Sequence, residues 1–136
     1  MLDSGGTAHP APPPGGNRAA AVYSYDAART FVRMAEGCSG ESRQWASRAW
    51  PFFKSRAGSG LAATYDLAGH AQGNASHPLA YVAAAGSAIA AGDAAAGRSL
   101  LDRAEAAQAA APTYYGAAWV ALGRIMLTTD WLGGCA

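Results

Sequence analysis

A short polar segment, Tyr23-Ser24-Tyr25-Asp26-Ala27-Ala28-Arg29, has residue types that could activate a water molecule. Ser24 is a typical N-cap residue, so a helix is predicted to begin there with Asp26 in its first turn. Free backbone N–H groups favour negative charge at that point, and Arg29 is close enough along the helix to pair with Asp26. An ionised carboxylate beside phenol groups is suited to accept a proton from water. The same spacing also occurs in ordinary surface ion pairs that only stabilise a helix.

This segment resembles a motif of glycoside hydrolase family 8, which has the pattern Tyr-x-Tyr-Asp-Ala-x-Arg. Two further segments resemble that family in the same order along the chain. Residues 60–69 and 78–86 are similar to its extended Tyr-x-Leu-x-Gly segment and the helix that follows. Residues 114–119 are similar to the paired tyrosines that begin the family's last helix. The resemblance covers residues 23–132.

The resemblance implies inverting hydrolysis of β-1,4-glycosidic bonds in cellulose or a related β-glucan, without a cofactor. Asp26 stands at the position of the family's general base, and Tyr25 and Arg29 match the residues that orient this base and its water. Tyr23 and Tyr65 are predicted to bind the polysaccharide.

The second carboxyl group that an inverting glycosidase needs is not matched in this chain. This general acid must lie roughly 6.5–9.5 Å from the base, so that a water molecule fits between them. In the family it is a glutamate in the N-terminal half of the domain, and the motif around it does not occur at Glu36, Glu41 or Glu105. The sequence is therefore expected to be the C-terminal half of a catalytic domain, inactive alone.

The pattern of apolar residues and helix-breaking residues predicts an all-α fold. Residues 1–18 are rich in Gly, Pro and Ala and are predicted to be a linker, and residues 19–136 are predicted to form the domain. Five helices in antiparallel hairpins would make about half of an (α/α)6 barrel. The first expected helix begins at Ser24, runs through Met34 and ends at Cys38. The others are 41–54 with a kink or a break at Trp50, 77–91, 93–111 and 114–128, with an extended segment near 61–68.

Net charge and hydropathy limit the partners of this chain. The formal net charge is only +1 and the charged fraction is 14%, so no basic patch for nucleic acid or an anionic membrane is predicted. No transmembrane segment or signal peptide is predicted. The family resemblance implies secretion of the full-length protein. A half-barrel would associate with its missing half, or with itself, through exposed apolar faces.

The two cysteines and two of the histidines have alternative interpretations. Cys38 and Cys135 can form one disulfide, or both can remain free thiols. His70 and His77 lack a third ligand at a suitable spacing, so no metal site is predicted.

A different class of function also fits the sequence. In a noncatalytic α-helical interaction module, Asp26 and Arg29 would merely stabilise a helix.

Overall fold

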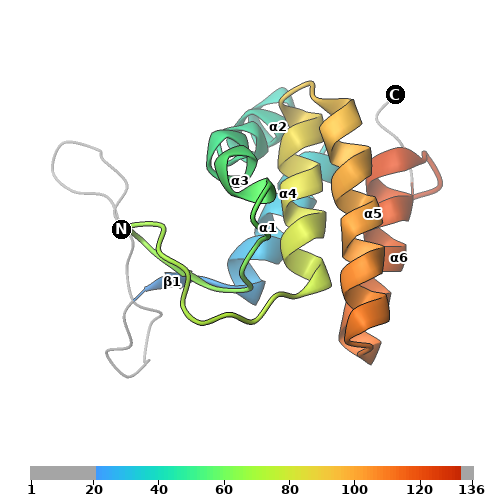
Figure 1. Ribbon diagram of the computed structural model, residues 1–136. Helices are drawn as coiled ribbons and strands as arrows, with labels where there is room; N and C mark the ends of the chain where they lie inside the picture. Colours follow the sequence, from blue (N-terminus) through green and yellow to red (C-terminus); the bar gives the residue numbers. More distant parts are fainter. Residues whose placement is uncertain (1–20, 133–136) are drawn as a thin grey trace, which may run out of the picture.

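Residues 21–132 of the 136-residue chain are described by the structure, a computed structural model. They form six α-helices and two short β-strands (Figure 1). In chain order these elements are β1 (Val22–Tyr23), α1 (Tyr25–Glu36), α2 (Gly40–Ser47), α3 (Trp50–Ala57), β2 (Tyr65–Asp66), α4 (Pro78–Ala90), α5 (Ala94–Ala110) and α6 (Tyr114–Thr128). The predicted all-α class is confirmed for this part of the chain. The predicted linker, residues 1–18, lies outside the described residues.

Helix α4 lies at the centre of the molecule. Its residues from Pro78 to Ala88 are all buried, and it contacts each of the other five helices within residues 21–132. A helix that is apolar on all sides is stable only when other elements cover it completely. The continuous apolar run in this segment therefore explains why the rest of the chain packs around it.

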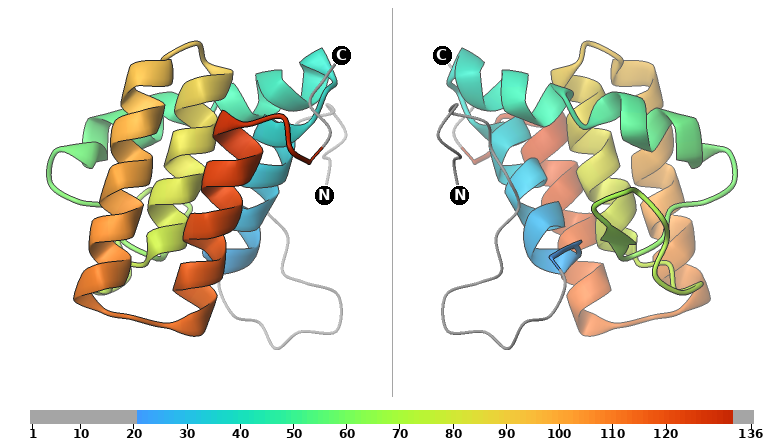
Figure 2. Two further views of the ribbon diagram at one scale, coloured as in Figure 1. Left: turned by 90° about the vertical axis from the view of Figure 1, so that its right-hand side faces the viewer. Right: turned by 90° about the vertical axis from the view of Figure 1, so that its left-hand side faces the viewer.

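Three of the helices run in the same direction. Helices α1, α4 and α6 all begin at the lower end of the molecule in Figure 1, whereas α5 runs the opposite way (Figure 1, Figure 2). The chain reverses after α4 at Gly92, whose positive φ of 86° suits a residue without a side chain. Asp93 then caps α5 by accepting the Ala96 N–H at 3.1 Å. As a result, the first turns of α1, α4 and α6 lie at one end of the molecule.

Small residues allow these parallel helices to approach closely. On α6, a Cβ atom at Gly123 would lie 2.5 Å from Cγ1 of Val82 on α4. On another side of α4, a Cβ atom at Gly86 would lie 3.0 Å from the Cβ of Ala35 on α1. The absence of side chains at both glycines therefore sets the spacing of α4 from its two parallel neighbours.

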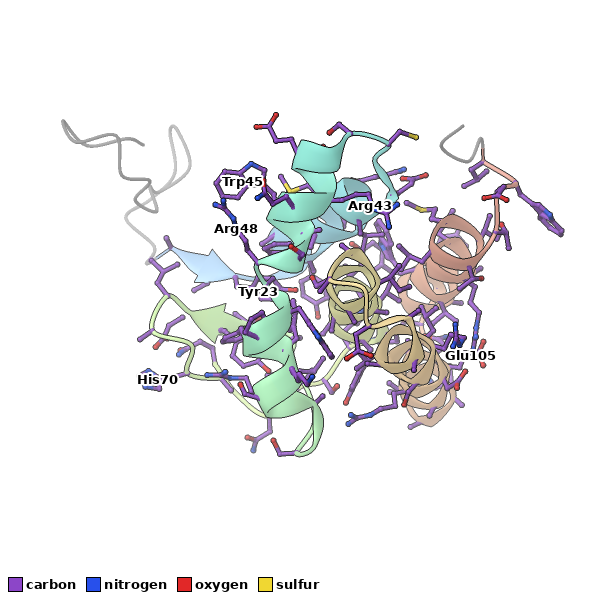
Figure 3. All side chains as sticks on the ribbon, turned by 90° about the horizontal axis from the view of Figure 1, so that it is seen from above. Tyr23, Arg43, Trp45, Arg48, His70 and Glu105 are labelled. Atoms are coloured by element: carbon purple, nitrogen blue, oxygen red, sulfur yellow. The ribbon has the colours of Figure 1, made fainter. Side chains whose placement is uncertain are left out.

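Residues 41–54, predicted as one helix with a kink or a break at Trp50, form two helices, which confirms the break. Helix α2 ends at Ser47 and α3 begins at Trp50, which places Pro51 second in α3. Proline is tolerated in a first turn because the N–H that it lacks would have no helical partner there. Helices α2 and α3 cross α4 rather than running alongside it (Figure 3). The predicted antiparallel hairpins are therefore found only at α4–α5 and α5–α6 within the described residues.

The extended segment predicted near 61–68 contains strand β2. Tyr65 pairs with Tyr23 in an antiparallel arrangement, so β2 is attached to β1 just before α1 begins. The Ser76 hydroxyl donates to the Leu61 carbonyl at 2.8 Å, which fixes the loop between β2 and α4. No helix within residues 21–132 combines the length and the apolar character needed to cross a bilayer.

Candidate functional site

The first turns of α1, α4 and α6 surround an open hollow with a volume of about 560 Å³. Three of its side chains come from α1, one precedes α4, and two come from the beginning of α6. The lining residues are Tyr25, Asp26, Arg29, His77, Thr113 and Tyr115. Parts of the chain that are far apart in sequence therefore meet at this end of the molecule.

Asp26 is the only carboxylate among the described residues that line this hollow. Its side chain is 90% exposed, and that of its partner Arg29 is 46% exposed. Arg29 donates to the Asp26 carboxylate, as the i,i+3 spacing predicted. Exposed pairs of this kind contribute about 0–1 kcal/mol to stability. The carboxylate is therefore freely accessible to water, and its ion pair adds little to the free energy of unfolding.

Ser24 is the N-cap residue of α1, as predicted, but its side chain does not cap the helix. Its hydroxyl instead lies 3.3 Å from the Thr64 hydroxyl, just before β2. The Ser24 carbonyl still accepts the Ala28 N–H at 2.9 Å, which starts the helical hydrogen bonds. The contact between the Ser24 and Thr64 hydroxyls therefore links the start of the Asp26-bearing helix to the β2 segment.

Three rings pack together in the hollow. The His77 ring lies 5.0 Å from the Tyr25 ring and 5.6 Å from the Tyr115 ring, measured between centroids. The two tyrosine rings are 6.1 Å apart, and Tyr115 also packs against the buried ring of Trp119. Aromatic rings at these distances attract one another. The cluster thus joins the starts of α1, α4 and α6, and it presents partly exposed ring surface beside Asp26.

The start of α6 is held close to α4 by a cap and a glycine. The Thr113 hydroxyl accepts the Gly116 N–H at 2.9 Å. A Cβ atom at Gly116 would lie 3.1 Å from Cγ of Pro78 and 2.2 Å from Oε1 of Gln108. A larger residue at position 116 would therefore displace Gln108 and crowd the Thr113 cap and Pro78 at the start of α4.

Tyr23 and Tyr65, the predicted substrate-binding residues, do not line this hollow. Tyr65 is 3% exposed, and its hydroxyl accepts the Ala62 N–H at 2.8 Å. Tyr23 packs against Tyr65, Phe31 and Phe53, and its hydroxyl is buried without a partner among residues 21–132. Burial, and to a lesser extent Tyr65, raises the pKa of Tyr23 well above its usual value. Both tyrosines line a separate hollow together with Phe52 and Phe53, so Asp26 and the two predicted substrate-binding residues lie in different hollows.

The glutamates of the chain do not supply a second carboxylate to the hollow. Glu36 is paired with Arg33 at 3.1 Å, at the opposite end of α1 from Asp26. Glu105 is paired with Arg124 at 2.7 Å and lies on the far side of the bundle from Tyr23 (Figure 3). The hydrogen bonds that Arg124 donates to Glu105 and Asp102 raise the pKa of Arg124, so its guanidinium stays charged. Both pairs have an ordinary structural role.

Three residues of the hollow were not among the predicted site residues: His77, Thr113 and Tyr115. Each lies in the first turn or cap of a helix, and the sequence did predict where those helices begin. The missing information was that α4 and α6 run parallel to α1, which brings their starts to Asp26. Burial lowers the pKa of His77, which favours its neutral form.

The remaining site predictions concern cysteines and metals. Cys135 lies outside the described residues, so its pairing with Cys38 stays a prediction. Within residues 21–132, no three histidine, cysteine or acidic side chains are grouped as a metal ion would need.

Comparisons with known proteins add no identification. No protein-family model, curated protein or solved structure matches this chain.

Proposed function

We propose that this chain is part of an inverting glycoside hydrolase that cleaves β-1,4 bonds in cellulose or a related β-glucan, with Asp26 as the general base. One observation carries the proposal. The helices of all three segments that resemble glycoside hydrolase family 8 begin around the same hollow, and Asp26 is the carboxylate in that hollow. Sequence resemblance alone does not require these starts to be neighbours.

The chemistry assigned to Asp26 is proton removal from water. The carboxylate holds a water molecule beside the anomeric carbon of the sugar, and it takes a proton as the water oxygen attacks that carbon. Arg29 fixes the orientation of the carboxylate through their ion pair. The rings of Tyr25 and Tyr115, inclined at 66° to each other, each offer apolar ring surface to the sugar.

The general acid belongs to polypeptide other than residues 21–132 under this proposal. Helices α1, α4 and α6 would be the inner helices of half an (α/α)6 barrel, with their first turns lining the cleft. Their common direction and the antiparallel course of α5 support this arrangement (Figure 2). The other half would then complete the cleft opposite Asp26.

A substrate that needs no acid tests the base in this chain directly. In β-cellobiosyl fluoride the fluoride ion leaves without a proton, so attack by water, with Asp26 taking its proton, completes the reaction. The full chain should release fluoride faster than buffer, and Asp26→Asn should reduce this excess by at least about 100-fold, the usual range for a lost base. Fluoride release is measured with an ion-selective electrode.

Glu36→Gln is the matched control, because it removes the other carboxylate that α1 pairs with an arginine three residues away. It should leave fluoride release unchanged. Equal rates for Asp26→Asn and the unmodified chain would exclude Asp26 as the base.

The noncatalytic helical module remains the second candidate, and the exposure of the ion pair favours it. A carboxylate that is 90% exposed and already paired is what a purely structural role requires. A module of this kind should give no fluoride release above buffer from either protein, so the same assay separates the two functions.

A further inference from the structure

The imidazole of His77 is held in one tautomer. His77 is the N-cap residue of α4, and its Nδ1 atom accepts the Leu79 N–H at 3.1 Å. A nitrogen that accepts a hydrogen bond carries no proton, so the neutral ring must carry its proton on Nε2. The start of a helix also disfavours a positive charge at this place. His77 therefore presents a fixed N–H donor.

The residue that carries this donor lines the hollow. His77 lines the hollow with Asp26 and Arg29, and no partner for Nε2 occurs among residues 21–132. Within that part of the chain, Tyr23 has the one buried side-chain polar atom without a partner. Because Nε2 of His77 has no partner there and is not one of the buried unpaired atoms, it has some contact with solvent and can donate to a ligand.

The surroundings of this donor suit a neutral sugar. The rings of Tyr25 and Tyr115 flank the imidazole, at centroid distances of 5.0 and 5.6 Å. Sugars combine flat apolar faces with hydroxyl groups, so they can contact an aromatic ring and accept a hydrogen bond at the same time. The charges of Asp26 and Arg29 compensate each other, which leaves His77 as a neutral donor in the hollow.

We infer that His77 is a substrate-binding residue whose Nε2–H donates to a hydroxyl oxygen of a β-glucan chain lying against Tyr25 and Tyr115. The inference rests on the proposed function, since it places the sugar beside Asp26. The two nitrogens of His77 then have different roles: Nδ1 caps the start of α4, and Nε2–H donates to the substrate.

The tautomer can be tested on the full chain by long-range proton–nitrogen NMR of its three histidines, with His77→Ser identifying the signal of residue 77. The proton should be found on Nε2, and the Nε2 signal should shift when cellotetraose is added. A proton on Nδ1, or a signal that cellotetraose does not shift, would overturn the inference.

Binding provides the second measurement. Serine is a good N-cap but is too short to replace the imidazole, so His77→Ser keeps the start of α4 and removes the donor. Its affinity for cellotetraose, measured by calorimetry, should fall roughly three- to tenfold, while its melting curve stays close to that of the unmodified chain. His77→Asn, a second capping substitution, should behave in the same way.

Unchanged affinity in both variants would overturn the inference, and so would a failure of the unmodified chain to bind cellotetraose. The proposed function is judged separately, by fluoride release from the Asp26→Asn protein. Loss of fluoride release in Asp26→Asn with unchanged binding in His77→Ser would remove only the role of His77. Unchanged fluoride release in Asp26→Asn together with weaker cellotetraose binding in His77→Ser would remove only the role of Asp26.

Discussion

At the scale of single residues, the hollow combines an accessible carboxylate with a neutral imidazole. Asp26 and His77 lie in the same hollow but in different surroundings. Asp26 is exposed and paired with Arg29, whereas His77 is half-buried, with one nitrogen bonded to the backbone. The carboxylate is thus available to water, and the imidazole is held in place by its bond to the backbone.

The cap formed by His77 should make stability depend on pH. Burial lowers its pKa below the ordinary value of about 6.5, so the unfolded chain binds a proton more readily than the folded one. The contribution of neutral His77 to the free energy of unfolding is complete above about pH 6.5. It is lost as the pH falls through the lower pKa that His77 has in the folded chain. The groups around it are Tyr25, Asp26 and Arg29 from α1 and Tyr115 from α6, and the opposite charges of Asp26 and Arg29 offset each other.

Urea unfolding between about pH 5 and pH 8 measures this dependence. The free energy of unfolding should fall on acidification, and the fall should be smaller in His77→Asn, which caps α4 without titrating. The same dependence in both proteins would show that other groups cause it.

At the scale of elements, capping residues made most of the helices predictable. Residues 114–128 were predicted as a helix and form α6, with Thr113 as its cap. The first and last residues of α4 and α5 were also predicted to within one residue. Pro78 and Asp93 mark where these two helices start. The split of residues 41–54 was predicted from Pro51 as a kink or a break at Trp50, and the break is what forms. The pairing of Tyr23 with Tyr65 was missed, because it depends on a contact between segments that are distant in sequence.

The contact between α4 and α6 should depend on Gly123. In Gly123→Ala the new methyl group meets Val82, and overpacking of this kind destabilises a protein by about 1–3 kcal/mol. This loss exceeds the gain of up to about 1 kcal/mol from the higher helix propensity of alanine. In a Val82→Ala background the clash disappears, so the same substitution should stabilise by up to about 1 kcal/mol. Gly40→Ala is a control without a close neighbour.

Thermal unfolding of the four proteins of this cycle measures the interaction: the unmodified chain, each single variant and the double variant. If Gly123→Ala destabilises the chain equally in the unmodified protein and in the Val82→Ala background, the close packing of α4 on α6 is contradicted.

At the scale of the whole molecule, α4 is buried from Pro78 to Ala88, whereas α6 has apolar residues that are exposed within the described part of the chain. Tyr114 and Leu122 are 93% and 37% exposed, and Ala117 and Ala121 between them are exposed as well. These residues recur at helical spacing, so they form one apolar face of α6. Such a face without a covering element favours association.

Leu122→Glu should therefore reduce self-association of the purified chain, as measured by light scattering over a range of concentrations. Ala106→Glu on the exposed side of α5 is the control, and it should leave association unchanged. A monomeric unmodified chain at high concentration would contradict the prediction.

The hollow itself shows the limit of sequence reasoning for this protein. The motif around Asp26 identified the carboxylate and its partner Arg29, because both lie on one helical turn. His77 and Tyr115 join them only through the packing of α4 and α6 around a common core. For Tyr65, sequence indicated an extended segment, but burial of the ring was decided by its contacts with Tyr23 and Phe52.

The configuration of the first product tests the central claim most directly. Proton NMR can follow the anomeric signals while the chain converts β-cellobiosyl fluoride. An inverting reaction with Asp26 as the base must first give the α-anomer of cellobiose, and Asp26→Asn must abolish its formation. Initial release of the β-anomer, or the same α-anomer formation by Asp26→Asn, would contradict the account.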